Sequence, residues 1–77
     1  MAALQELINK GMEYVLYTDG EGHILEVMCG TVAVYDLRLR LNEAEELRFA
    51  AEGEPFLAAF ADEIRTFPSR FYDRNIR

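Results

Sequence analysis

The chain has few of the side chains from which enzyme and metal sites are usually built. Among 77 residues there is one cysteine, one histidine, one serine and no tryptophan. A single cysteine excludes an intramolecular disulfide framework and a multi-cysteine zinc site. One histidine and one cysteine also leave too few ligands for a transition-metal centre within one chain. We therefore expect a protein that uses neither a metal nor a cofactor.

Phosphate-binding loops and long apolar segments are missing as well. The five glycines are dispersed, and neither GxGxxG nor GxxxxGK[ST] occurs. No apolar run approaches the ~20 residues of a membrane-spanning helix. The opening MAALQELINKG lacks the basic segment and long apolar core of a secretory signal. These features predict a cytoplasmic protein that does not associate with a membrane.

Only one pair of residues, Cys29 and His23, could act as a nucleophile and its base. They are six positions apart on an expected strand, so they share a face but lie about 20 Å apart. That distance is too long for the hydrogen bond that activates a nucleophile. We expect Cys29 to be a small buried residue and His23 to be solvated at a hairpin tip. The sequence predicts neither an enzyme nor a catalytic residue.

Basic residues are few and unevenly placed. Fourteen acidic and eight basic residues give a net charge of −6. Residues 1–63 carry thirteen acids and four bases, a net −9, whereas residues 64–77 carry one acid and four arginines, a net +3. Nucleic-acid binding depends on lysine and arginine replacing counterions. The acidic balance therefore argues against nucleic acid as the main partner.

The chain is short enough to form a single domain over residues 1–77, and its first expected element is a helix. Leu4, Leu7 and Ile8 recur at the spacing of one helical face, and Gly11 follows as a helix-ending glycine would. The sequence thus predicts a short helix over Ala2–Lys10.

Three strands are expected next. The segments Glu13–Thr18 and His23–Cys29 are rich in aromatic and β-branched residues, and the turn-forming DGEG at 19–22 joins them into a hairpin. Gly30 is expected to form a bend. The segment Thr31–Leu41 then alternates apolar and polar side chains, which is typical of a strand with one buried face.

Two helices complete the expected fold. Asn42 and Glu45 have the spacing of a capping box, which predicts a helix that stops before Gly53. Pro55 suits the first turn of a second helix, and Pro68 ends it. The predicted class is α+β, a three-stranded antiparallel meander with helices packed on one face, in the order α-β-β-β-α-α.

The expected sheet has apolar residues on its second face as well. If the second strand points Leu25 inward, Ile24 and Met28 point outward, and Val32 and Val34 lie on the outer side of the third strand. An apolar patch on an otherwise solvated face usually marks an interface. We predict a homodimer, formed sheet to sheet or through an edge strand, with these four outward residues as its candidate interface.

The arginines form the second candidate surface. If the tail is helical, its arginines share one face and could bind carboxylates or phosphates there. An aromatic residue lies between them in the sequence. The alternative is that the arginines pair internally with the acidic helices. The candidate partner-binding residues are Arg38, Arg40, Arg70, Arg74, Arg77 and Tyr72.

These patterns favour a non-catalytic protein-interaction module. We expect a small acidic homodimer that binds another protein as a regulator, an accessory subunit or an immunity- or antitoxin-like neutraliser of a basic partner. A second hypothesis is a module that binds an anionic ligand or nucleic acid through the arginine-rich tail. A third is an obligate subunit of a larger enzyme.

Overall fold

The computed structural model describes residues 4–29 and 35–76 of the chain. The α+β class is confirmed, but the antiparallel sheet has four strands instead of three and is followed by three helices. The elements are β1 (Gln5–Asn9), β2 (Tyr14–Thr18), β3 (His23–Cys29), β4 (Tyr35–Arg40), α1 (Glu43–Glu52), α2 (Glu54–Thr66) and the 3₁₀ helix η1 (Pro68–Arg74).

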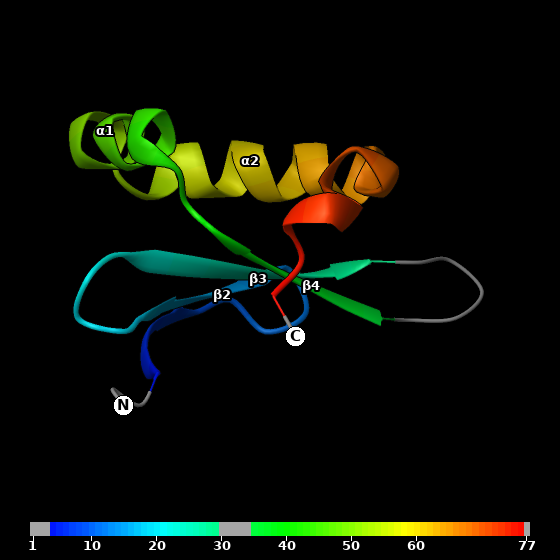
Figure 1. Ribbon diagram of the computed structural model, residues 1–77, viewed down its shortest axis with the longest axis horizontal. Coiled ribbons are helices and arrows are strands. Elements are labelled where there is room, and N and C mark those ends of the chain that lie inside the picture. The colour runs from blue at the N-terminus through cyan, green and yellow to red at the C-terminus, as the bar shows by residue number, and fades with distance from the viewer. Residues whose placement is uncertain (1–3, 30–34, 77) are drawn as a thin grey trace.

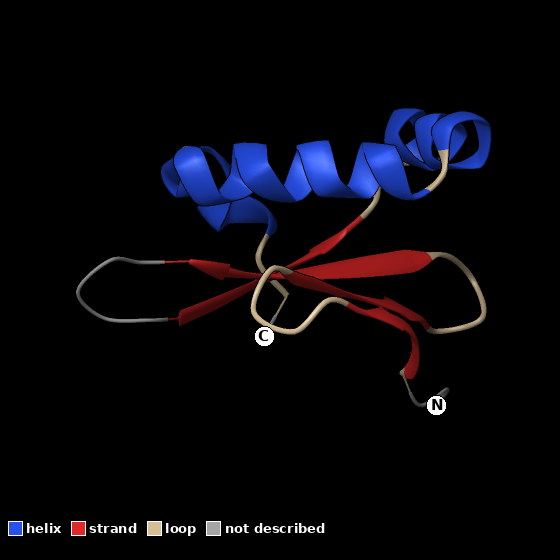
Figure 2. Cartoon of the chain, turned by 180° about the vertical axis from the view of Figure 1, so that it is seen from behind, coloured by secondary structure: helices blue, strands red, loops and turns tan. Residues whose placement is uncertain are grey.

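The helices form one layer and the sheet forms the other. Figure 1 shows α2 running along one face of the sheet, with α1 beside one end of it and η1 below the other. Figure 2 shows the same two layers from behind. The strands follow one another in the order β1-β2-β3-β4, each antiparallel to its neighbours. The prediction of helices packed on one face of a meander is therefore confirmed.

The predicted helix over Ala2–Lys10 is wrong, because the described part of this segment contains the edge strand β1. A bulge between Glu6 and Ile8 shifts the register against β2, so that Ile8 packs on the core while Leu7 stays exposed. An apolar spacing that looks helical is thus produced by a strand with one extra residue. Hydrogen bonds to β2, which the local sequence does not show, decide the outcome.

Gly11 has a different role from the one expected. It has a φ of 64° and lies in the turn between β1 and β2, where the Glu13 N–H donates to the Lys10 carbonyl at 3.2 Å. A positive φ is easily adopted only by glycine. The sequence therefore indicated the backbone conformation correctly, but in a hairpin turn instead of at a helix end.

The other predicted strands are confirmed where the structure describes them. The strands β2, β3 and β4 align Leu16, Leu25 and Leu39 across the sheet on its inner face. In the 19–22 turn, the Asp19 carboxylate accepts the N–H groups of Glu21 and Gly22. The expected bend at residue 30 and strand positions 31–34 lie outside the described residues.

The predicted helix boundaries are also confirmed. Asn42 caps α1: its side chain accepts the Glu45 N–H at 2.8 Å, and the Glu45 carboxylate accepts the Asn42 N–H at 2.9 Å. Gly53 has a φ of 72° and separates the two helices. Pro55 occupies the first turn of α2, and Pro68 follows its end.

The core lies between the inner face of the sheet and α2. The helix α2 buries five side chains, and strands β2–β4 supply the facing leucines, a valine and a cysteine. By contrast α1, which is described in full, has no buried residue and contacts the core only through the half-buried Phe49. Truncating a buried apolar side chain loses the transfer free energy of the deleted atoms and leaves a cavity, and both effects lower the free energy of unfolding.

We predict that Leu57→Ala lowers the free energy of unfolding by about 2–5 kcal/mol, because Leu57 is fully buried. Leu47→Ala, the same change on the neighbouring helix where Leu47 is 67% exposed, should stay within about 0.5 kcal/mol of the wild type. Urea unfolding of the two variants measures the difference. Equal losses would contradict the assignment of the core to α2.

Candidate interaction surfaces

The two strand arginines lie on the face of the sheet opposite the helices, and each has a carboxylate partner. The Arg38 Nε lies 2.7 Å from the Glu26 carboxylate, and its guanidinium stands 5.5 Å from the centre of the Tyr17 ring. Arg40 forms an ion pair with Asp19 in the 19–22 turn. Binding an external anion through these arginines would therefore have to compete with carboxylates already in place.

Asp19 is held ionised by this arrangement. The hydrogen bond from Arg40, together with the two backbone N–H groups of the turn, keeps the pKa of the Asp19 carboxyl well below its usual value. The interaction links the end of β4 to the β2–β3 turn, 21 positions away in the sequence.

The tail arginines have different neighbours. Arg74 donates to both oxygens of Glu45 on α1, at 2.7 and 3.0 Å, and also to the Arg40 carbonyl. Arg70 stands 4.2 Å from the centre of the Phe67 ring. A 3₁₀ helix has three residues per turn, so side chains four positions apart do not align as in an α-helix. Arg77 lies outside the described residues.

The ion pair of Arg74 fastens α1 to the end of the chain. Burial raises the pKa of Glu45, but the hydrogen bonds from Arg74 and from the Asn42 N–H, together with the Arg74 charge, outweigh it, so the pKa is lowered. Arg74 and Glu45 belong to the arginine tail and the acidic helices, respectively. For Arg74, the structure therefore contains the internal ion pair that was the alternative to partner binding by the tail arginines.

Tyr72 lies on the surface and pairs with a second tyrosine. Its hydroxyl is 2.9 Å from that of Tyr35 on β4. This hydrogen bond, with smaller contributions from burial and from the Tyr72 charge, raises the pKa of Tyr35 to about 12. Both rings are largely exposed, so η1 and β4 present two polar aromatic side chains to solvent.

The candidate dimer residues on the outer sheet face are only partly available. Ile24 is 4% exposed, so it is already covered within the protomer, and Met28 is half-buried. Val32 and Val34 lie outside the described residues. The same face carries the Arg38–Glu26 pair.

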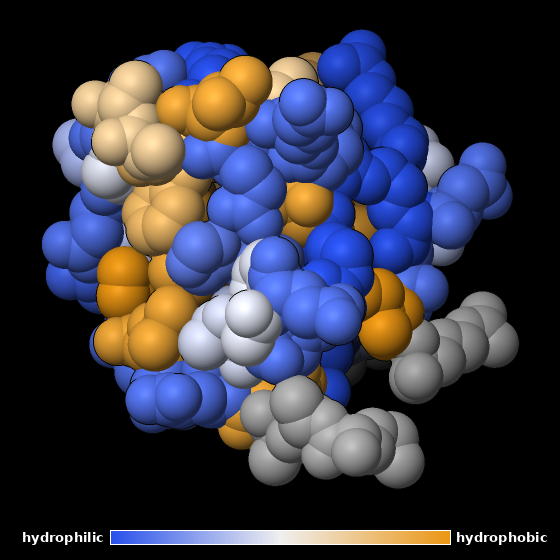
Figure 3. All heavy atoms as spheres, turned by 60° about the vertical axis from the view of Figure 1, so that its left-hand side comes forward, coloured by the Kyte–Doolittle hydropathy of each residue, from blue (hydrophilic) through white to orange (hydrophobic). Residues whose placement is uncertain are grey.

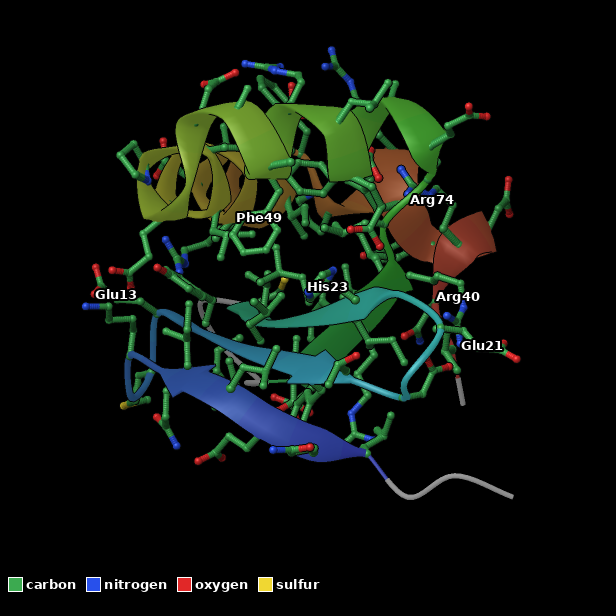
Figure 4. All side chains as sticks on the ribbon, turned by 90° about the vertical axis from the view of Figure 1, so that its left-hand side faces the viewer. Glu13, Glu21, His23, Arg40, Phe49 and Arg74 are labelled. Atoms are coloured by element: carbon green, nitrogen blue, oxygen red, sulfur yellow. The ribbon has the colours of Figure 1, made fainter. Side chains whose placement is uncertain are left out.

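His23 is only partly solvated, with its side chain 29% exposed, whereas the sequence predicted a solvated residue at a hairpin tip. Its Nδ1 is 2.7 Å from the Glu46 carboxylate, which also accepts the His23 backbone N–H at 2.9 Å, and Phe49 packs edge-on against the ring. Figure 4 shows His23 between the sheet and α1. Cys29 is buried as predicted, and burial raises the pKa of its thiol, which lowers its reactivity.

The helical layer carries most of the negative charge. Residues 43–66 contain seven acids and two arginines, a net −5 against −6 for the whole chain. Figure 3 shows a face on which hydrophilic residues predominate and hydrophobic ones reach the surface in smaller groups. The exposed acids of this layer are Glu43, Glu52, Glu54, Asp62 and Glu63.

A pocket that the sequence did not indicate opens between the β1–β2 turn and α2. It has a volume of about 430 Å³, within the usual range of small-molecule sites. Its two walls are at least 40 positions apart in the chain, so no local motif could have revealed it. The lining residues are Lys10, Glu13, Tyr14, Glu54, Pro55, Ala58, Ala61 and Arg65.

Two other kinds of site are absent from residues 4–29 and 35–76. No group of three or more histidine, cysteine, aspartate or glutamate side chains in these ranges is arranged to hold a metal ion. None of the described helices is long and apolar enough to cross a membrane.

Comparison of the chain with protein-family models, with curated proteins and with solved structures finds no match.

We predict that the protein loses stability in acid partly through Asp19. A carboxylate whose pKa is lowered on folding stabilises the fold above its unfolded pKa of about 4, and this contribution is lost as the pH falls toward the folded value. Asp19→Asn should therefore be less stable than the wild type at pH 7 and show a smaller further loss from pH 5 to pH 2. Urea unfolding over that range measures it.

Glu21→Gln is the matched control, because Glu21 is an exposed carboxylate in the same turn that lies outside the described ion pairs. It should keep the acid dependence of the wild type. An Asp19→Asn variant with that same dependence would show that the Arg40 contact adds nothing to the stability of the fold.

Proposed function

We propose that this chain is a non-catalytic protein-interaction module that forms a homodimer and binds a basic protein partner through its acidic helical layer. The proposal rests on which charged side chains are paired within the described residues and which are not. Arg38, Arg40 and Arg74 are each paired with a carboxylate, whereas exposed acids such as Glu43 and Glu63 lie outside the described ion pairs. The charge left for an external partner is therefore negative.

An acidic surface of this kind steers a basic partner during association. Summed charge raises association rates through long-range attraction, and complementary charge selects among partners. The exposed Leu47 on α1 adds apolar area within the same layer. Charged residues around a few apolar contacts are a common composition for a transient interface.

The geometry of the only nucleophile–base pair supports a role without catalysis. Cys29 and His23 occupy opposite ends of β3, and each is engaged locally: the thiol donates to the Val27 carbonyl and the imidazole contacts Glu46. A nucleophile needs a base within hydrogen-bond reach.

Anionic-ligand or nucleic-acid binding is the alternative. It would use the same arginines, but replacing each internal carboxylate with an external phosphate exchanges one charge-assisted hydrogen bond for another and gains little. Arg70, which stacks on Phe67 instead of forming a described ion pair, is the arginine best placed to serve this alternative.

The open edge of the sheet supports the homodimer. At the β4 edge, the Ile76 N–H donates to the Arg38 carbonyl and Asn75 bridges to Leu39, so the tail covers part of it. At the other edge, no described strand pairs with the outer side of β1, where Leu4 and Leu7 are exposed. Exposed, unpaired edge strands are templates for pairing with a second copy.

We predict that the chain elutes as a dimer at high concentration and that Leu7→Lys shifts it to a monomer, because a charge on an edge strand opposes pairing. Size-exclusion chromatography with light scattering at two concentrations measures this. Leu47→Lys places the same charge on α1 and should leave the dimer intact. A wild type that is monomeric throughout would refute edge pairing.

The charge-based partner model predicts that Glu43→Gln/Glu63→Gln weakens partner binding. Removing two exposed helical charges should slow association about tenfold at low salt and have less effect at high salt. The partner is captured from a lysate of the source cells and then purified, and association rates are measured by surface plasmon resonance.

The matched control is Glu21→Gln/Asp36→Asn, which removes two exposed charges from a turn and from β4. It should bind nearly as well as the wild type. A captured partner that is itself acidic, or equal effects of the two double variants, would contradict the model. Salt-sensitive binding of a labelled oligonucleotide would favour the arginine alternative.

A further inference from the structure

The floor of the 430 Å³ pocket is an almost completely buried tyrosine. Tyr14 is 4% exposed, and its ring belongs to the hydrophobic core. Its hydroxyl makes no hydrogen bond within the described residues, although no described polar side-chain atom is both sealed from solvent and unpaired. Tyr14 also lines the pocket.

The charged residues that line the pocket are two acids, Glu13 and Glu54, and two bases, Lys10 and Arg65. Lys10 lies 3.5 Å from Glu54, and both side chains are about half exposed. Arg65 donates a hydrogen bond to the Glu13 carbonyl at 2.7 Å and lies 3.9 Å from the Asp62 carboxylate. Among these four residues, the Glu13 carboxylate lies outside the described ion pairs.

The Lys10–Glu54 pair is weak enough to be replaced. Exposed ion pairs at this separation add little to stability, because water screens them and long side chains lose entropy. Glu54 can therefore exchange Lys10 for another cation at little cost. Arg65 is held by two groups and is less free to receive an anion.

The charges that act on the Tyr14 hydroxyl are those of two carboxylates and one ammonium group. Burial raises the pKa of the Tyr14 hydroxyl, the charges of Glu54 and Glu13 raise it further, and Lys10 opposes them. The hydroxyl stays neutral, so its oxygen is free to accept a hydrogen bond.

We propose that this pocket binds a primary ammonium or guanidinium group at the end of an aliphatic chain. The charged group donates to the Glu54 carboxylate and to the Tyr14 hydroxyl oxygen. The wall formed by Pro55, Ala58 and Ala61 covers the methylene groups. Long cationic side chains and free alkylamines both place their stems against apolar surface and their charge among acceptors.

This site does not depend on the proposed protein partner, since a free amine would occupy it alone. The test is a titration of the ¹⁵N-labelled chain with n-butylammonium and n-butylguanidinium, followed by amide chemical shifts. Shifts should concentrate at residues 10–14 and 54–65 and should saturate. Butyrate and 1-butanol, which share the chain but not the positive charge, should bind at least fivefold more weakly.

Two variants give changes of opposite sign. Glu54→Gln removes the main acceptor charge and should weaken butylammonium binding about fivefold, whereas Lys10→Met removes the competing cation and should tighten it about threefold. An anionic ligand would show the reverse order. Glu21→Gln, which makes the same change in net charge at the far end of the molecule (Figure 4), should bind as the wild type does.

Tyr14→Phe keeps the ring in the core and removes only the hydroxyl, so it tests the second acceptor if Glu54→Gln fails to fold. It should weaken binding severalfold. A peptide with one capped lysine, compared with its norleucine analogue, identifies the source of the cation. Saturable shifts with the lysine peptide assign the site to a protein side chain, and shifts with the free amines alone assign it to small molecules. No saturable shift with either cation, or equal binding of butyrate, would overturn the proposal.

Discussion

The packing of α2 against the inner face of the sheet is the constraint on which the other features depend. Leu57 and Ile64 are fully buried against strands whose leucines align at Leu16, Leu25 and Leu39. A chain of this length buries only about 60% of its extended surface, so it has no second core to compensate for a loss here. The single cysteine is free and the described residues form no metal-binding cluster, so neither a disulfide nor a metal adds to the stability of the core.

With α2 fixed, the helix α1 is held mainly by polar contacts. The helix α1 is attached through Glu46 to His23 and through Glu45 to Arg74, and only Phe49 reaches the core from it. This arrangement consumes basic groups within the protomer and leaves acids facing solvent. The excess of acids comes from the composition of the chain, and the docking of α1 decides which of them face solvent.

The same placement of α2 creates the pocket. Its first and last turns bring Glu54 and Arg65 to the β1–β2 turn, where Lys10 and Tyr14 meet them. The edge strand β1 supplies both this turn and the open side of the sheet. The proposed ligand pocket thus lies where elements distant in the sequence meet.

The sequence by itself determined the features that depend on near neighbours: the turn at 19–22, the Asn42 cap, the break at Gly53 and the burial of Cys29. It could not determine β1, because an edge strand with a bulge has the same short apolar spacing as a helical turn, and only pairing with β2 distinguishes them. Tertiary structure also decided the partners of the arginines and the pocket. The contacts of Arg38, Arg40 and Arg74 and the walls of the pocket bring together residues 12 to 55 positions apart, and their energies depend on distances that no local pattern fixes.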